Sequence, residues 1–224
     1  MNHITKIIII SLATILVITI GILSFILSEP VEYYLTGKVT ARAYITEATP
    51  EDCLVTLKTG KNYVSFYCET GRPIEEALHD NVTEFNYKAT YRYNPLDPSN
   101  PWRINNPNLP EWVNQNLNEI RRHEGYVIIM NEQRTYNHTG FLSANNNIQL
   151  REGWNLVGYT LSVERNIENA MNSIQGQFTR VEEYDEETNT WKVYVPGEVN
   201  EISTLKPMKS YWIYAKEDVL WTLN

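Results

Sequence analysis

One block of sequence occurs twice in this chain, and that duplication constrains the fold more than any other feature. The segment from Leu57 to Tyr91 aligns without a gap on the segment from Leu150 to Tyr184. The residues of the first copy that meet identical residues are Leu57, Gly60, Asn62, Val64, Arg72, Ile74, Glu75, Ala77, Phe85 and Tyr91. Each copy is long enough to enclose its own hydrophobic core, so we expect two tandem modules and not a short-period solenoid.

An apolar run precedes the two copies, from Ile7 to Leu27, and no charged residue interrupts it. At helical rise it would span about 30 Å, the thickness of the hydrocarbon core of a bilayer. A cleaved signal peptide is the alternative. The run exceeds the usual apolar length of such peptides, and no small-x-small pair stands near Ser28. The sequence therefore predicts an uncleaved transmembrane helix with the lipid bilayer as its partner.

Charges on either side of this run predict its orientation. Lys6 precedes it, whereas Glu29 and Glu32 follow it. By the positive-inside rule the N-terminus would be cytoplasmic and both modules extracytoplasmic, in a single-pass protein of the cell membrane. The net charge of −8 and the lack of a basic run argue against nucleic acid as a partner.

The predicted fold class is α+β, with an N-terminal transmembrane helix followed by two small duplicated modules rich in antiparallel strands. The predicted segments are a cytoplasmic tip and anchor (1–29), a juxtamembrane linker (30–37), module 1 (38–131) and module 2 (132–224). Alternating patterns predict strands at Lys38–Ile45, Phe85–Tyr93, Tyr126–Met130 and Thr135–Leu142, the last of which would open module 2. Helical patterns predict helices at Arg72–His79, Glu111–His123 and Asn166–Ile174.

The two cysteines flank a predicted hairpin. Its turn would be Gly60-Lys61, with glycine at the first central position of a type II′ turn. In that register Cys53 lies opposite Cys68, so we expect a disulfide. Two buried free thiols are the alternative, since a cytosolic location disfavours disulfides. A metal site is not expected, because no further cysteine or histidine cluster supplies the remaining ligands.

Two tripeptides fit the glycosylation acceptor pattern, at Asn81 and at Asn137. They are compatible with an extracytoplasmic location. Such tripeptides also arise by chance in an asparagine-rich chain, so they add little to the argument.

The second copy contains the run from Arg151 to Tyr159 (REGWNLVGY), with Val181 to Asp185, Trp191 and Ser210 to Tyr214 (SYWIY) downstream. This pattern resembles the "GWNLVGYP…GYWI" repeat module of prokaryotic, especially archaeal, surface and secreted proteins. The first copy keeps only a worn version. This chain departs from the module at Thr160, Ser210 and Lys61. The resemblance implies an exported, modular and non-catalytic part of the cell envelope, and it brings no catalytic residues.

Residue patterns typical of catalysis or metal binding are weak in this sequence. The histidines lack metal-site spacing, and no serine lies in a nucleophile motif. Acidic residues gather at Glu182, Glu183, Asp185, Glu186 and Glu187. They suit either a calcium or paired-carboxylate site or a solvated hairpin turn, and the spacing favours the turn. We therefore predict no enzyme activity, no metal and no cofactor.

Aromatic residues are the stronger candidates for function. Trp102 and Trp112 accompany the proline-rich stretch Asn94–Pro110, where the first module departs most from the second, and we take both as candidate binding residues. The alternative is that this insertion packs against the sister module. The repeat positions favour a structural role in the core for Gly60, Gly153, Trp154, Tyr184, Trp191, Tyr211 and Trp212.

These observations predict a membrane-anchored, extracytoplasmic structural or interaction protein of the cell envelope, with other envelope proteins as partners. The alternative is a pair of glycan-binding modules, and an anchored hydrolase is a distant third. Exposed tryptophan and tyrosine in a groove would favour a glycan ligand. A flat apolar patch would favour a protein partner, and convergent polar groups in a pocket would favour catalysis.

Overall fold

The structure is a computed structural model of the 224-residue chain. The chain divides into two compact units, Met1–Thr49 and Pro50–Asn224. In the first unit, strand β1 (Glu32–Leu35) pairs antiparallel with β2 (Val39–Arg42). The structure describes residues 32–35, 39–42, 51–68, 70–78, 85–110, 112–113, 115–140, 142, 145–198 and 200–223.

The structure does not bear out the predicted transmembrane helix or the single-pass membrane location built on it. Across the described ranges, none of the helices is both long enough and apolar enough to cross a bilayer. The apolar run Ile7–Leu27 itself lies outside the described residues.

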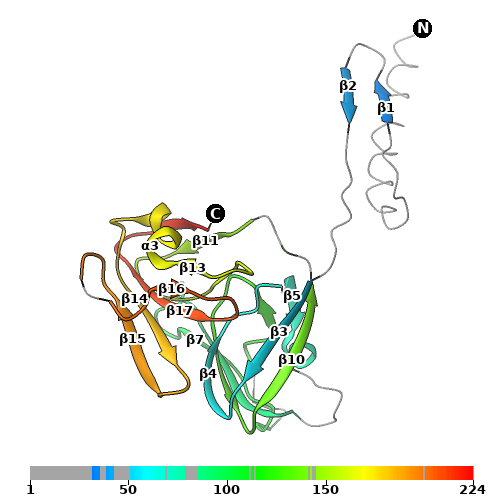
Figure 1. The fold of residues 1–224 in the computed structure, drawn as a ribbon. Coiled ribbons are helices and arrows are strands. Elements are labelled where there is room, and N and C mark those ends of the chain that lie inside the picture. The colour runs from blue at the N-terminus through cyan, green and yellow to red at the C-terminus, as the bar shows by residue number, and fades with distance from the viewer. Residues whose placement is uncertain are drawn as a thin grey trace. The chain divides into compact units, whose positions relative to one another are not determined.

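The second unit consists of short strands arranged as two repeats (Figure 1). The first repeat comprises β3 (Glu51–Leu57), β4 (Gly60–Val64), β5 (Thr70–Pro73), α2 (Ile74–Ala77), β6 (Tyr87–Tyr93), β7 (Trp102–Asn105), β8 (Glu119–Arg121), β9 (Tyr126–Met130) and β10 (Arg134–Gly140). The second comprises β11 (Asn147–Leu150), β12 (Gly153–Gly158), β13 (Arg165–Asn166), α3 (Ile167–Ala170), η1 (Asn172–Ile174), β14 (Phe178–Asp185), β15 (Thr190–Tyr194), β16 (Thr204–Leu205), β17 (Ser210–Ala215) and β18 (Val219–Thr222).

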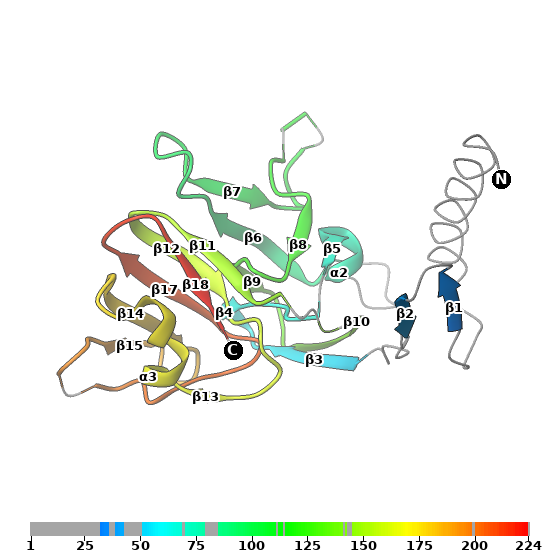
Figure 2. The same cartoon turned by 90° about the horizontal axis from the view of Figure 1, so that it is seen from above.

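Strand pairing follows one plan in both repeats (Figure 2). The four-stranded sheets have the orders β4-β9-β6-β7 and β12-β17-β14-β15. The two-stranded sheets are β5-β8 and β3-β10 in the first repeat, and β13-β16 and β11-β18 in the second. The strand expected at Thr135–Leu142 is present as β10. It pairs with β3 of the first repeat and does not open the second.

The predicted α+β class is wrong, because the described part of the second unit is an all-β fold with short helical turns. The helix expected at Glu111–His123 is absent from the described residues of that range, which include β8. Leu117 and Ile120, three residues apart, imitate a helical stripe. Both are buried, but β8 gains its hydrogen bonds from β5, so the chain needs no helix there. The proline-rich stretch Asn94–Pro110 contains strand β7.

The predicted hairpin is also wrong, because β3 and β4 are consecutive but unpaired. β3 pairs with β10, and β4 pairs with β9. The chain turns a corner between two sheets at Gly60, whose φ of 90° is a conformation that favours glycine. Gly153 has the same conformation, with φ of 89°, at the equivalent corner between β11 and β12. Gly60 and Gly153 therefore serve corners between sheets, and not the hairpin turn that was expected at Gly60.

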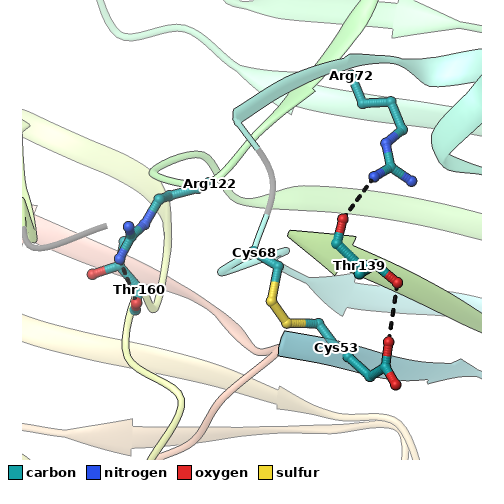
Figure 3. The surroundings of a disulfide bond; sticks show 7 residues. Cys53, Cys68, Arg72, Arg122, Thr139 and Thr160 are labelled. Atoms are coloured by element: carbon teal, nitrogen blue, oxygen red, sulfur yellow. Dashed lines mark hydrogen bonds between the residues drawn. A yellow bond between two sulfur atoms is a disulfide. The ribbon is translucent and has the colours of Figure 1, made fainter. Parts of the chain in front are cut away.

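The predicted disulfide between Cys53 and Cys68 is present, with 6.3 Å between the two Cα atoms (Figure 3). It ties β3 to the segment that follows β4. β10 adds polar contacts beside it, because the Thr139 hydroxyl donates to Asp52 (3.0 Å) and Arg72 donates to the Thr139 carbonyl (3.3 Å). The disulfide therefore holds together the side of the first repeat where β3, β5 and β10 meet.

Each repeat encloses a hydrophobic core of its own. In the first, Tyr87, Phe66 and Ile120 are fully buried in one cluster of residues drawn from β3 to β10 and the segments that join them. In the second, Trp221 is fully buried, and its indole N–H donates to the Ala170 carbonyl (2.7 Å). Burying such large apolar side chains is the main source of stability for each repeat.

The two repeats contact each other reciprocally. The Ser65 N–H donates to the Met208 carbonyl, and the Gly158 N–H donates to the His123 carbonyl, both at 3.1 Å. In the aligned repeats Ser65 is the equivalent of Gly158. By strand pairing, β9 is the equivalent of β17, so His123 before β9 is the equivalent of Met208 before β17. Each contact is therefore the counterpart of the other, as expected for halves related by a pseudo-two-fold axis.

Glycine and serine face each other where the repeats are closest. A Cβ added to Gly125 would lie 2.8 Å from the Cβ of Ser210, its equivalent in the second repeat. A Cβ added to Gly158 would lie 2.7 Å from the Cβ of Ser65. Both contacts depend on the missing side chain, so these glycines allow the two sheets to approach.

Candidate binding surface

The outer face of the second four-stranded sheet is aromatic. Side chains alternate between the two faces along a strand. In β17, Tyr211 and Ile213 are fully buried in the core, whereas Trp212 and Tyr214 point to the other face. Trp154 of β12 is the cross-strand partner of Tyr214, so three aromatic side chains share this face.

The first repeat adds two more aromatic rings. Tyr93 of β6 and Trp102 of β7 are cross-strand partners. Their ring centroids lie 5.0 Å and 6.0 Å from that of Trp212. On the second repeat the row continues from Trp212 to Trp154 (6.0 Å) and from Trp154 to Tyr214 (5.2 Å). We call Tyr93, Trp102, Trp154, Trp212 and Tyr214 the aromatic row.

A second aromatic group adjoins this row. The rings of Tyr63, Tyr184 and Trp191 lie 4.9 to 5.1 Å from one another. Trp191 of this group and Trp212 of the row line the same pocket. Burial raises the pKa of Tyr63, and the nearby Tyr184 and Glu186 add to that rise. Tyr63 therefore remains a neutral phenol, and its ring packs against Tyr184 and Trp191.

A hollow of about 220 Å³ opens between these groups. We call it the aromatic hollow, and its lining residues are Tyr93, Trp154, Glu182, Trp191 and Trp212. Trp191 is 41% exposed, and the ends of the row, Trp102 and Tyr214, are 40% and 37% exposed. The hollow thus offers aromatic surface from both repeats to solvent.

The charges beside the hollow are paired. Glu182 forms an ion pair with Arg180 at 2.8 Å. The Arg180 guanidinium also lies over the Trp154 ring, 5.9 Å from its centroid. The carboxylate in the hollow can accept hydrogen bonds while its charge is balanced by a neighbouring cation.

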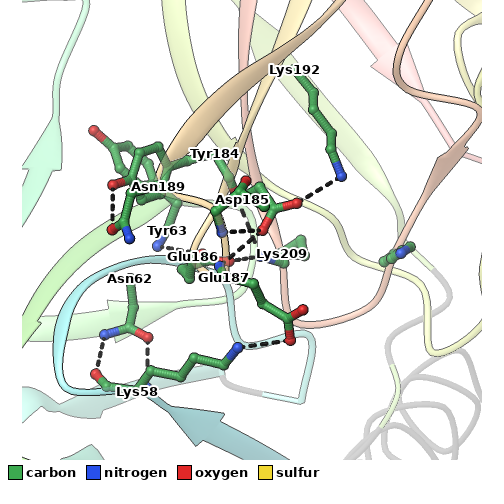
Figure 4. A network of polar contacts seen from close by, with 12 residues as sticks. Lys58, Asn62, Tyr63, Tyr184, Asp185, Glu186, Glu187, Asn189, Lys192 and Lys209 are labelled. Atoms are coloured by element: carbon green, nitrogen blue, oxygen red, sulfur yellow. Dashed lines mark hydrogen bonds and ion pairs between the residues drawn. The ribbon is translucent and has the colours of Figure 1, made fainter.

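The acidic residues at the β14–β15 turn lie at another cleft, of about 470 Å³, at the joint between the repeats (Figure 4). Asp185 pairs with Lys192 and Glu187 pairs with Lys58 of the first repeat, each at 2.8 Å, and Glu186 pairs with Lys209. Asp185 also accepts the N–H groups of Glu187 and Thr188. These contacts are those of a hydrogen-bonded turn, and within the described ranges no group of three acidic, histidine or cysteine side chains is placed to hold a metal.

Two carboxyl groups of this turn have opposite pKa shifts. The hydrogen bond from Lys192, with those from the backbone, holds the pKa of Asp185 well below its ordinary value. Burial raises the pKa of Glu183, which is only 7% exposed, although Lys209, Lys206 and Lys192 oppose the rise. The turn therefore contains one stabilised and one destabilised carboxylate two residues apart.

The structure separates the two tryptophans that the sequence singled out. Trp102 belongs to the aromatic row, whereas Trp112 is 85% exposed on the segment between β7 and β8 and is not part of the row. Among the repeat positions expected in the core, Tyr211 is buried in the core of the second repeat. Trp154, Trp191 and Trp212 lie on the outer face, and Tyr184, although buried, lies on that face beside its cross-strand partner Trp191.

Sequence reasoning missed Tyr63, Tyr93 and Glu182 as parts of the site. The alternation in β17 (SYWIYA) could have placed Trp212 opposite the core-facing Tyr211. Tyr93 is harder to predict, because a bulge between Tyr87 and Ala89 changes which side chains of β6 face the core.

Of the two predicted glycosylation positions, Asn137 lies exposed in β10. Asn81 is outside the described residues.

Comparison of the chain with protein-family models, with curated proteins and with solved structures found no match.

Proposed function

We propose that this protein is a non-catalytic binding protein and that its aromatic hollow holds a glycan. The observation that supports this most is that four aromatic side chains, contributed by both repeats, surround a solvent-open hollow with a carboxylate in its lining. Tryptophan and tyrosine rings stack on the C–H faces of sugars and offer a polar edge to the hydroxyl groups. Glu182 supplies a strong acceptor for a sugar hydroxyl.

A binding role fits the hollow better than catalysis does. Glycoside hydrolysis commonly uses two carboxyl groups on opposite sides of the scissile bond. Among the described residues that line the hollow, Glu182 is the one carboxylate, and it is ion-paired with Arg180. The described lining of the hollow therefore lacks the second carboxyl group that such a mechanism needs.

A glycan array followed by calorimetry of the best hits tests this proposal on the full chain. Trp191→Ala should lower the affinity about tenfold or more, as expected for an aromatic anchor at the centre of a site. Trp112→Ala is the matched control, since it removes the same side chain from an exposed position outside the hollow. Unfolding midpoints of both variants show that the fold is intact. Failure of the intact protein to bind any glycan, or equal affinities for Trp191→Ala and Trp112→Ala, would refute the proposal.

An interaction with another protein is a second candidate, favoured by the segment between β7 and β8. Trp112 and Leu109 lie on it and are 85% and 37% exposed. Exposed tryptophan is the residue type most enriched in the energetic centres of protein interfaces. A photoreactive amino acid at position 112 should give a discrete crosslinked product in the native host, whereas the same group at the exposed position 137 should not. Identical products from both positions would argue against this role.

A further inference from the structure

We propose that the ligand is a neutral oligosaccharide of at least three sugar units, bound along the aromatic row across both repeats. This inference rests on the proposed glycan-binding function and adds the length and the charge of the ligand.

The length follows from the extent of the row. Tyr214, Trp154, Trp212 and Trp102 follow one another with centroid separations of 5.2, 6.0 and 6.0 Å. Neighbouring rings are turned edge to face, so ring faces and ring edges alternate along the row, and a ligand that contacts all four rings must extend well beyond one of them. A single sugar would fill the hollow between Trp191 and Trp212 and leave the outer rings of the row uncovered.

Both ends of the row are open. Trp102 at one end is 40% exposed, and Tyr214 at the other is 37% exposed. A site for a chain terminus or a single sugar is commonly closed on one side, because it must enclose most of the ligand. Open ends allow an internal stretch of a longer chain to lie across the row.

The charge follows from the ion pair beside the row. Arg180 is engaged by Glu182 at 2.8 Å and by the Trp154 ring, so its cation is already compensated. An anionic sugar would have to displace Glu182 from Arg180 at an energetic cost. The protein as a whole carries a net charge of −8, which repels polyanionic chains at long range. Both terms favour a neutral ligand.

The joint between the repeats holds the two halves of the row in place. The reciprocal hydrogen bonds of Ser65 with Met208 and of Gly158 with His123, each 3.1 Å long, fix the two sheets relative to each other. The rings are also packed edge to face, so they lose little freedom when a ligand binds. A preorganised surface of this kind gains affinity with each further unit that contacts it.

Calorimetry with neutral oligosaccharides tests this inference on the full chain. The probes are the glucose, xylose and N-acetylglucosamine series from monosaccharide to hexasaccharide, with oligogalacturonides as the anionic comparison. The affinity for one neutral series should rise at least tenfold between monosaccharide and trisaccharide and level off once the row is covered.

Two end variants separate a row from a single-sugar site. Trp102→Ala and Tyr214→Ala should each weaken binding of the hexasaccharide severalfold and leave the affinity for the disaccharide within twofold of the wild type. Both residues are partly exposed, and the unfolding midpoint of each variant is measured beside the wild type.

The possible failures have different meanings. A monosaccharide that binds as tightly as its hexasaccharide would overturn the length of the ligand and leave the glycan-binding function standing. Tighter binding of oligogalacturonides than of every neutral series would overturn its neutrality. If none of these sugars binds and the glycan array is also blank, the proposed function itself fails.

Discussion

Asn62 and Asn155 make the same set of hydrogen bonds at equivalent corners of the two repeats. The Asn62 amide accepts the Lys58 N–H (2.8 Å) and donates to the carbonyls of Lys58 (2.8 Å) and Gly60 (3.0 Å). The Asn155 amide accepts the Arg151 N–H (2.9 Å) and donates to the carbonyls of Arg151 (2.7 Å) and Gly153 (2.9 Å). At each corner the backbone passes from one sheet to the next and loses strand-to-strand hydrogen bonds, and the asparagine side chain supplies hydrogen bonds in their place.

Replacing either asparagine by alanine should destabilise the protein. Asn62→Ala or Asn155→Ala leaves an N–H and two carbonyl groups without their partner, and we expect a loss of about 1–3 kcal/mol in the free energy of unfolding. Urea denaturation measures it. Asn137→Ala, at an exposed position of β10, should change the free energy by less than about 0.5 kcal/mol. Equal stability of all three variants would show that the corners hold without these side chains.

Removing the disulfide should destabilise the first repeat. Cys53 and Cys68 are 15 residues apart, and closing a loop of that length in the unfolded chain is worth about 3 kcal/mol in the chain-entropy model. The double variant Cys53→Ser/Cys68→Ser should therefore unfold at lower urea concentration than the oxidised wild type. Adding a reductant should lower the wild-type midpoint and leave that of the variant unchanged. A reductant effect of equal size on both proteins would contradict this explanation.

Replacing Gly125 or Gly158 at the joint by alanine should lower the free energy of unfolding, but by different amounts. In Gly158→Ala the new Cβ would meet the carbonyl oxygens of Glu124 (2.7 Å) and Arg122 (2.8 Å), which are backbone atoms. In Gly125→Ala its two closest neighbours are side-chain atoms of Leu156 and Ser210, both at 2.8 Å. Overpacking costs about 1–3 kcal/mol, and we expect Gly158→Ala to lose more because backbone moves less readily than side chains. Thermal or urea unfolding of the two variants gives the order, and the reverse order would contradict it.

The β14–β15 turn should produce opposite pH dependences from two neighbouring carboxyl groups. Burial raises the pKa of Glu183, so its charged form costs stability at neutral pH, and this cost disappears as the pH falls through the raised pKa. Glu183→Gln should thus be more stable than the wild type at neutral pH, with the difference narrowing on acidification. The pKa of Asp185 is lowered, so its contribution is present at neutral pH and is lost only in strong acid.

Accordingly, Asp185→Asn should be less stable than the wild type at neutral pH, and this difference should also narrow in acid. Glu152→Gln, an exposed substitution, serves as the control for a change of charge alone. Urea denaturation at a series of pH values measures all three. Shifts of the same sign for Glu183→Gln and Asp185→Asn would contradict the assignment.

The sequence predicted local features better than long-range pairing. Tyr126–Met130 forms strand β9 as expected, because a strand of this kind depends on a short pattern. The two cysteines are bonded, but not through the predicted hairpin: the cross-strand partner of Cys53 is His138 of β10. The partner of β3 could not be found in the same way. It is β10, far along the chain, whereas the glycine corner at Gly60 resembles a hairpin turn in sequence.

The same limit explains why the sequence predicts the candidate site only in part. Alternation along β17 separates Trp212 from Tyr211, but it does not say that the second face meets another repeat. Repeat position alone therefore predicts a place in the core for Trp154, Trp191 and Trp212, although they lie on the outer face. Their exposure depends on how the two sheets approach each other, which no local pattern encodes. Trp112 shows the converse, because its spacing from Leu117 and Ile120 suggested a helix that the pairing of β8 with β5 replaces.

The glycine-serine contacts at the joint have a consequence for assembly. Gly125 and Ser210 are equivalent residues that touch, so they lie beside the pseudo-two-fold axis, and the same holds for Gly158 and Ser65. Two copies of the second repeat joined in this way would bring Ser210 against a second Ser210, where the structure leaves room for a side chain on one partner only. Two copies of the first repeat would likewise set Ser65 against a second Ser65. The glycine of each repeat thus complements the serine of the other, which disfavours self-pairing between separate chains through this surface.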